Sequence, residues 1–364
     1  MNIGIIGSGQ LGWMMIIEGR KLQNSYYILD SDPGPASRVA DGFLPLKEYR
    51  KFVDSCDVVT FEFEHVDEHA LLYAEKKHKL RPSIDAIMLK RERAAEKEFL
   101  SSVGVPLARY TIADSGEEAM RDANKFKRAV IKASRGGYDG KGQYYFDASK
   151  PYAGRMRLPA GERYVVEEHI DFDCEASIIA SRDENGIKRF HTPSMNRNEV
   201  GILFYNDAPF EDFGMRGVAS KILDALDYVG VMGIEFFITG SRCIVNEIAP
   251  RVHNSGHHTL HGSSISQFEQ HLRTITGLPI PEPVLYKPSG IVNSVGTEIT
   301  REVEMKLLKI PETHSYPYGK RELRKRRKMG HVNINAGSRR ELAERRNDVI
   351  SVLYGKEPLD FFLP

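Results

Sequence analysis

The sequence predicts an α/β protein with a parallel sheet at its N-terminus, followed by an α+β part in which strands predominate. Near the N-terminus, helical patterns alternate with short apolar runs at 2–6, 26–32 and 57–64. That alternation is typical of parallel strands joined by crossover helices. A later stretch, 129–181, holds several apolar runs and is predicted to be β-rich. A hairpin is expected at 233–249, where Gly240 and Ser241 separate two apolar runs.

The chain is predicted to divide into four units. A helix at 92–103, which Gly104 stops, opens the second unit, and the strands at 162–170 and 174–181 belong to a small lid there. A proline-rich stretch at 277–290 marks the last boundary. In chain order the units are a βαβ domain that binds substrate phosphate, the lid subdomain, a core domain and a C-terminal domain, covering 1–91, 92–180, 181–276 and 277–364.

Charge and cysteine content exclude several classes of protein. Lys and Arg number 51 against 50 Asp and Glu, a balance that argues against a general nucleic-acid binder. The three cysteines are far apart and show no CxxC spacing, which favours a reducing cytosol over a disulfide framework or a zinc site. We expect no signal peptide and no membrane span, because no uninterrupted apolar run approaches eighteen residues.

Two glycine-rich segments are candidate phosphate sites. GSGQLG, Gly7 to Gly12, follows a strand and precedes a helix, with Asp30 about twenty residues on, so either a dinucleotide or a sugar phosphate fits it. A tight turn without a ligand is the alternative. The loop 134–143, SRGGYDGKGQ, points more specifically to phosphate binding, because its glycines let backbone amides approach a triphosphate. Lys132 lies just before this loop, and Lys141 lies inside it. Its alternative is a hairpin tip with solvated lysines.

Glu235 and Glu247 are predicted to form a metal site. They lie on the two strands of the hairpin, and an odd loop centred on Ser241 places them opposite one another, with Cβ atoms about 5 Å apart. Two carboxylates that close require a cation or a proton between them, and magnesium held with ATP phosphates suits them. An even loop, in contrast, separates them as unrelated surface acids. The acids that end the strand at 165–170, and Glu175, are ambiguous by themselves.

The segment 246–259, NEIAPRVHNSGHHT, concentrates polar donors after a strand. Arg251 offers a bidentate fork for a carboxylate or bicarbonate, and His253, Asn254 and Ser255 can donate to the same anion. Zinc is an alternative, but HExxH is lacking and Gly256 interrupts the histidines, which are His253, His257, His258 and His261.

The basic run 320–328 is either a solvated face, a nucleic-acid patch, or a source of one or two cations for an anionic substrate.

In this order, these motifs resemble the ATP-grasp superfamily and, within it, the 5-(carboxyamino)imidazole ribonucleotide synthases of purine biosynthesis. The resemblance runs through nearly the whole chain, and GGYDGKGQ combined with NEIAPRVHNSGH is highly specific to that family. The motifs that carry it are GSGQLG (7–12), TFEFEHV (60–66), IKASRGGYDGKGQ (131–143), VVEEHI (165–170), YVGVMGIEFFIT (228–239), NEIAPRVHNSGHHT (246–259), SISQFEQHLR (264–273) and RKMGHVNI (327–334).

The resemblance implies an ATP-dependent ligase that converts ATP, bicarbonate and 5-aminoimidazole ribonucleotide into the N-carboxylated ribonucleotide, ADP and phosphate, through carboxyphosphate. It also implies a cytoplasmic homodimer. Position by position, the residues implied for ATP are Arg93, Lys132, Gly137, Tyr138, Asp139, Gly140, Lys141, Gly142, Gln143, Glu167, Glu168, His169, Ile170, Glu175, Asn198, Asn246 and Glu247. Magnesium is expected on Glu235 and Glu247, and bicarbonate on Arg251, His253, Asn254 and Ser255. For the ribonucleotide the set is Gln10, Leu11, Glu62, Tyr138, Asp139, Lys320 and Arg327.

Some positions depart from the family pattern. Trp13 stands where the family usually has Arg, Asn198 where a His often contacts nucleotide, and His258 where Trp is common. The basic run holds one extra residue, so Arg326 and Lys328 compete with Arg327 for the substrate phosphate. Other functions left open are a formate- or biotin-type ATP-grasp ligase, a non-catalytic binding protein, and an NAD-dependent oxidoreductase that rests on GSGQLG and Asp30 alone.

Overall fold

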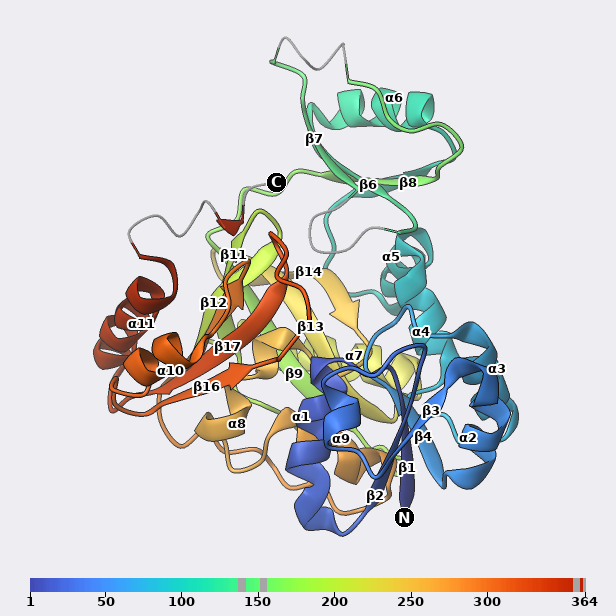
Figure 1. Cartoon of the computed structure of the whole chain (residues 1–364). Helices are drawn as coiled ribbons and strands as arrows, with labels where there is room; N and C mark the ends of the chain where they lie inside the picture. The colour runs from blue at the N-terminus through green and yellow to red at the C-terminus, as the bar shows by residue number, and fades with distance from the viewer. Residues whose placement is uncertain (137–141, 151–155, 356–360, 363–364) are drawn as a thin grey trace.

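The computed structural model describes residues 1–136, 142–150, 156–355 and 361–362. Three sheets organise them: a four-stranded N-terminal sheet, a four-stranded lid sheet and a nine-stranded central sheet. Figure 1 shows the lid sheet standing apart from the other two sheets, at the top of the view. None of the helices described there is long and apolar enough to cross a membrane.

The N-terminal sheet is parallel throughout, as the sequence predicts. Its order is β3-β2-β1-β4, from β1 (Asn2–Ile6), β2 (Ser25–Asp30), β3 (Gly42–Pro45) and β4 (Val58–Phe61). Side chains of β1 alternate between two cores: Ile3 and Ile5 pack toward α1 (Gln10–Gly19), and Ile6 packs toward α2 (Tyr49–Ser55) and α3 (Glu68–Lys76). The sheet is therefore covered on both faces, which explains its continuous apolar runs.

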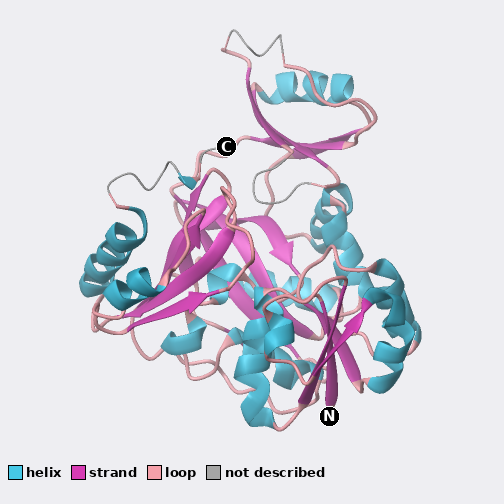
Figure 2. Ribbon diagram, in the orientation of Figure 1, coloured by secondary structure: helices cyan, strands magenta, loops and turns pink. Residues whose placement is uncertain are grey.

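The lid sheet is antiparallel and has a helix on one face only (Figure 2). Its order is β5-β8-β6-β7, from β5 (Tyr110–Ala113), β6 (Arg128–Ala133), β7 (Gln143–Asp147) and β8 (Tyr164–Glu168). Ile131 and Val166 point into the core beneath α6 (Gly116–Phe126). The alternate residues Lys132 and Glu167 point to the other face and line a cleft.

The central sheet is antiparallel and joins the middle of the chain to its C-terminal part. Its order is β14 (Arg242–Ala249), β13 (Gly230–Thr239), β9 (Cys174–Arg182), β11 (Ser194–Glu199), β12 (Ile202–Ala208), β15 (Ser289–Val295), β17 (Lys328–Asn335) and β16 (Thr313–Pro317), and β10 (Lys188–Phe190) pairs with β9. The strand predicted at 174–181 is thus β9, inside this sheet and not in the lid as expected. When two apolar strands follow one another in the chain, their local sequence does not indicate which sheet each of them joins.

The C-terminal strands β15, β16 and β17 extend the same sheet through the pairing of β15 with β12. They share a core of their own with α10 (Arg301–Leu307) and α11 (Arg339–Tyr354). A separate C-terminal sheet is therefore not formed, although the residues after 277 were expected to form a unit. The boundaries near 91, 180 and 276 stay predictions.

Helices close the remaining faces of the central sheet. On one side, α5 (Arg93–Val103) and α7 (Met215–Ala225) pack against β9, β13 and β14. Gly104, with φ +71°, ends α5 as predicted, in the left-handed conformation that glycine adopts without strain. On the other side, α9 (Gln267–Ile275) lies between the sheet and α1 (Figure 1). α4 (Ile84–Arg91) and the short α8 (Thr259–Gly262) complete the described helices of the chain.

Candidate active site

A cleft of about 1000 Å³ lies between the lid sheet, the central sheet and the end of β4. It gathers candidates from across the chain; those that line it are Gln10, Leu11, Glu62, Arg93, Lys132, Gln143, Glu167, Glu168, His169, Ile170, Glu175, Asn198, Glu235, Asn246, Glu247, Arg251, His253, Asn254, Lys320 and Arg327. Two described candidates, Gly142 and Ser255, do not line it. Gly137, Tyr138, Asp139, Gly140 and Lys141 lie outside the described residues.

Glu235 and Glu247 face each other across the β13–β14 hairpin. The turn has two residues, Gly240 and Ser241, so the odd loop that the sequence hypothesis required is wrong. A β-bulge restores the register, because Phe236 pairs with Val245 and the next pair is Glu235 with Glu247. Asn246 is the extra residue of the bulge. The two acids are therefore directly opposite by a route that the loop length alone did not indicate.

The two carboxylates differ in charge environment. Burial raises the pKa of the Glu235 carboxyl well above its usual range, and the charges of Glu247 and Glu175 add to the rise. Burial also disfavours the charge of Glu247, but Lys90, whose Nζ lies 2.8 Å from Glu247 Oε2, brings its pKa well below the usual range. A cation placed between the two would favour ionisation of both.

The donors around this pair fit a magnesium ion. Glu235 and Glu247 supply hard carboxylate oxygens at the cleft surface, and Asn246 supplies a neighbouring amide oxygen. Magnesium keeps much of its coordination for water and phosphate oxygens, so two protein carboxylates are enough. The histidines of the zinc alternative diverge instead: His257 contacts Gln267, His258 the Ser255 carbonyl and His261 the Tyr316 hydroxyl. Within the described ranges no group of three or more His, Cys, Asp or Glu could hold a metal ion.

Two lysines converge on Glu167 at the lid side of the cleft. Lys132 Nζ lies 2.5 Å from Glu167 Oε2, and Lys97 Nζ lies 2.7 Å from Glu167 Oε1. Lys97 also donates to the Asn246 carbonyl at 3.0 Å, so it joins α5, the lid and β14. The sequence analysis missed Lys97; its signal is the helical spacing of four residues from Arg93, which puts both on one face of α5.

Acid should weaken the protein measurably through Glu167. Burial opposes its charge, but Lys132 and Lys97 lower its pKa to about 2, against 4.5 for an ordinary Glu. The folded-state pKa is depressed, so this stabilisation is present above pH 4.5 and is lost as the pH falls toward 2. It amounts to about 3 kcal/mol. Urea unfolding between pH 7 and pH 3 should show a shallower pH slope for Glu167→Gln than for the wild type.

The matched control for that slope is Glu168→Gln. Glu168 lies on the same strand and pairs with Arg109, but it is one-third exposed, so its contribution is screened by solvent. Equal slopes for the wild type and Glu167→Gln would contradict the assigned charge state of Glu167.

An aromatic wall lies beside the end of β8. Phe172 and Phe237 stack with ring centroids 4.7 Å apart, and both line the cleft next to Ile170. Such a wall suits the flat face of a purine base. The sequence analysis missed Phe237, although it lies two residues after Glu235 on the same strand and therefore on the same face. Close by, Asn198 hydrogen-bonds Glu175, whose pKa burial nevertheless raises.

Three of the four candidate anion residues, Arg251, His253 and Asn254, line the cleft. Arg251 Nε lies 2.9 Å from Glu64 Oε1, an ion pair with a buried acid from the end of the N-terminal sheet. Burial lowers the pKa of His253 to about 3, so its ring is neutral, and His253 Nδ1 contacts the Ser255 hydroxyl at 2.9 Å. Ser255 is fully buried, so its side chain orients His253 and does not face the cleft. Asn254 exchanges amide hydrogen bonds with Asn293.

Cations from the segment before and at the start of β17 also line the cleft. Lys320 Nζ donates to the Lys328 carbonyl at 2.8 Å, which ties the two ends of the basic segment together. Arg326, at φ +63°, donates to the carbonyls of Val200 and Phe362. Arg327 donates to the Glu322 carbonyl at 3.0 Å. The basic run is therefore a folded part of the cleft wall.

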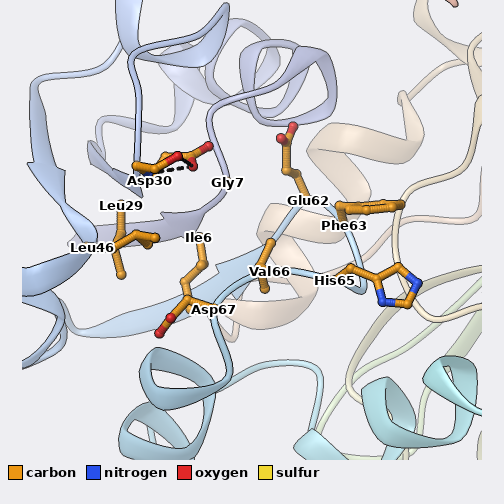
Figure 3. A pocket seen from close by; sticks show the side chains of 11 residues that line it. Ile6, Gly7, Leu29, Asp30, Leu46, Glu62, Phe63, His65, Val66 and Asp67 are labelled. Atoms are coloured by element: carbon orange, nitrogen blue, oxygen red, sulfur yellow. Dashed lines mark hydrogen bonds between the residues drawn. The ribbon is translucent and has the colours of Figure 1, made fainter. Parts of the chain in front are cut away.

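Backbone N–H groups of the glycine turn GSGQLG are paired with a carboxylate in this structure. The Glu62 carboxylate, at the end of β4, accepts the backbone N–H groups of Gly9 and Gly12 at the start of α1. Figure 3 shows Glu62 and Asp30 on either side of the turn, at a pocket of about 450 Å³. A carboxylate thus fills the position that a dinucleotide phosphate would need. The sequence does not reveal this cap, which comes from fifty residues away, and the substrate-phosphate site expected in this domain stays a prediction.

Trp13 packs edge-on against Tyr316 and Tyr318, with ring centroids 6.0 and 6.5 Å away. The indole thereby joins α1 to the C-terminal strand β16 and the turn after it. Trp13 does not line the cleft. Where the family usually has a charged Arg, this chain therefore has an aromatic side chain that packs between two parts of the chain.

An antiparallel lid sheet with paired lysines, set over a larger sheet with paired carboxylates, defines an ATP-grasp enzyme. Family models agree: the ribonucleotide synthetase preATP-grasp domain matches residues 1–91, the ATP-grasp domain 98–268, and the phosphoribosylaminoimidazole carboxylase C-terminal domain 289–345. A relative from Saccharolobus solfataricus, an N5-carboxyaminoimidazole ribonucleotide synthase, is 45% identical over 97% of this chain and 96% of its own. The chain belongs to the N5-carboxyaminoimidazole ribonucleotide synthase family.

Solved structures of the same family superpose on nearly the whole chain. The Staphylococcus aureus enzyme complexed with ADP has a TM-score of 0.89 at 29% identity and covers 97% of this chain and 96% of its own. The Aspergillus clavatus enzyme, in complex with ADP and 5-aminoimidazole ribonucleotide, has a TM-score of 0.85 at 27% identity, with coverages of 97% and 98%. The fold class and the ATP-grasp resemblance predicted from the sequence are confirmed.

Proposed function

We propose that the protein uses magnesium-ATP and bicarbonate to carboxylate the amine of 5-aminoimidazole ribonucleotide. The observation that carries this proposal is that one cleft gathers all the groups the reaction needs. An aromatic pair, Lys132 with Glu167, Glu235 with Glu247, Arg251 and the cations of 320–328 all line it. Family membership supports the same reaction.

ATP fits the end of the cleft under the lid sheet. Its base would stack beside Phe172 and Phe237, and Glu175 with Asn198 would accept and donate hydrogen bonds at the ribose. Lys132 and Arg93 would neutralise the phosphates, aided by the predicted loop amides of 137–143. Magnesium would bind Glu235 and Glu247 and, when bound, offset the charge that develops on the phosphate oxygens.

The first chemical step joins bicarbonate to the γ-phosphate. A bicarbonate oxygen attacks the γ-phosphorus, the bond to the β-phosphate oxygen breaks, and ADP leaves, giving carboxyphosphate. Arg251 would hold the bicarbonate with its guanidinium while Glu64 fixes the orientation of that side chain. His253, which is neutral and whose ring is oriented by Ser255, would add a hydrogen bond to the bicarbonate. Bicarbonate is a weak nucleophile, so positioning supplies much of the rate.

The second step transfers the carboxyl group to the ribonucleotide. The amine nitrogen attacks the carboxyl carbon, the carbon–oxygen bond to phosphate breaks, and inorganic phosphate leaves with the electron pair and takes the proton that the amine loses. The ribonucleotide phosphate would bind Lys320 and Arg327, and Gln10, Leu11 and Glu62 would contact its sugar side. Because carboxyphosphate hydrolyses readily, the site must exclude water, which the lid sheet over the cleft favours. We further propose that the enzyme acts as a homodimer in the cytoplasm, on the strength of the family resemblance.

The product test uses ¹³C-bicarbonate with ATP and 5-aminoimidazole ribonucleotide. Carbon NMR should show a carbamate signal that grows with ADP formation and disappears when the ribonucleotide is left out. ATP consumption with ¹³C appearing in no ribonucleotide would reject the carboxylation and leave another ATP-grasp ligase as the function.

A further inference from the structure

Lys90 occupies an unusual position at the metal-binding carboxylates. It lies in the last turn of α4, and its Nζ is 2.8 Å from Glu247 Oε2 and 3.5 Å from Glu96 Oε2. Its side chain is 16% exposed. Because a buried ammonium is stable only beside negative charge, these two carboxylates hold it in place. Neither the motifs nor the roles assigned above use this lysine.

The two carboxylates that contact Lys90 differ in how firmly the structure holds them. Glu96, on α5, is buried, and its Oε1 accepts the Ile248 backbone N–H at 2.8 Å, which fixes it to β14. The Glu247 side chain is 39% exposed and faces the cleft. The ammonium therefore lies between a carboxylate that is anchored in the core and one that is open to a ligand.

A magnesium ion on Glu247 would meet the ammonium as a competitor. Both cations seek the same carboxylate, and two positive charges a few ångströms apart repel each other strongly in a partly buried site. The repulsion falls if the ammonium moves the short distance to Glu96, which already lies within ion-pair range. Glu96 thus offers Lys90 a second position at little cost in buried charge.

We propose that Lys90 is a positioning residue that holds Glu247 opposite Glu235 while the cleft is empty and gives up this carboxylate to the metal by shifting to Glu96. The inference rests on the proposed metal site at Glu235 and Glu247. The ammonium thus takes the place of the metal beside Glu247 and offsets the charge of that carboxylate before nucleotide arrives. Metal affinity therefore depends on a residue that does not touch the metal.

The test measures metal binding without nucleotide, by titrating Mn²⁺ and following free ion by electron paramagnetic resonance. Lys90→Met removes the competing charge, so Mn²⁺ should bind about tenfold more tightly than to the wild type. Glu96→Gln removes the second position, so Mn²⁺ should bind more weakly than to the wild type. Lys90→Arg keeps the charge and should stay near the wild-type affinity.

Thermal unfolding separates this role from simple packing. Lys90→Met removes the cation beside the buried Glu96 and the partly exposed Glu247, so its Tm should fall without metal and recover largely with Mg²⁺. Lys79→Met is the matched control. Lys79 donates to the carbonyls of Val53, Asp54 and Cys56, and none of these residues lines the cleft, so its loss of Tm should not recover with Mg²⁺.

The outcomes distinguish the two levels of proposal. If Mn²⁺ binds the wild type and Lys90→Met with equal affinity, or if Mg²⁺ restores Lys79→Met as well as Lys90→Met, the role of Lys90 is rejected and the metal site stands. If Glu235→Gln and Glu247→Gln bind Mn²⁺ as tightly as the wild type, the metal site itself is rejected, and the role of Lys90 is rejected with it.

Discussion

Replacing Glu247 with glutamine should lower kcat by at least about a thousandfold, because the metal would lose a charged ligand whose effect on transition-state charge is several kcal/mol. The fold should remain intact, since Lys90 keeps its ion pair with Glu96 and the β13–β14 register depends on backbone pairing. Steady-state ADP release measures the rate, and far-UV circular dichroism with thermal unfolding checks the fold.

A control of equal chemistry is Glu117→Gln. Glu117 is exposed on α6, on the face of the lid away from the cleft, so its replacement should leave kcat within twofold of the wild type. Wild-type-like turnover in Glu247→Gln would overturn the metal assignment.

Replacing Arg251 with glutamine should reduce kcat/KM for bicarbonate about a hundredfold, which corresponds to about 3 kcal/mol for a charge-assisted contact in a buried site. The loss should be specific. Arg251 pairs with Glu64, whereas Lys132 at the proposed ATP end pairs with Glu167, so the KM for ATP should change less than threefold. Initial rates with bicarbonate varied at saturating ATP measure the first quantity, and the converse series measures the second.

Arg216→Gln is the companion variant, because Arg216 is an exposed arginine on α7 that does not line the cleft. It should behave as wild type in both series. Equal losses for ATP and bicarbonate in Arg251→Gln would show a general disturbance of the cleft and contradict an anion site at this arginine.

Local pattern was enough to predict much of the fold. The alternation of apolar runs and helices indicated the parallel N-terminal sheet, and Gly104 correctly marked the end of α5. The pattern did not reveal which sheet each strand joins. β9 follows β8 closely in the chain and is equally apolar, yet it pairs with β13 and β11 in the central sheet. Sheet membership depends on contacts between distant segments, which local periodicity does not encode.

The candidate site was predictable where its functional side chains lie close together in the sequence. Glu235 and Glu247 could be paired from their spacing, although the real cause is a bulge at Asn246 and not an odd loop. Contacts between distant segments were not predicted. Glu62 was expected at the ribonucleotide, but its cap on the helix that begins within GSGQLG was not, and neither were the ion pairs of Lys97 with Glu167 and of Lys90 with Glu247. A lysine or glutamate on a helix carries no local sign of the partner it will meet.

The most direct measurement is ADP release with each component omitted in turn from a mixture of enzyme, magnesium-ATP, bicarbonate and 5-aminoimidazole ribonucleotide. Carboxylation through carboxyphosphate predicts one ADP and one phosphate per carboxylated ribonucleotide, and full turnover only when bicarbonate and the ribonucleotide are both present. Full-rate ADP release without bicarbonate, or NADH consumption with no ATP turnover, would contradict it.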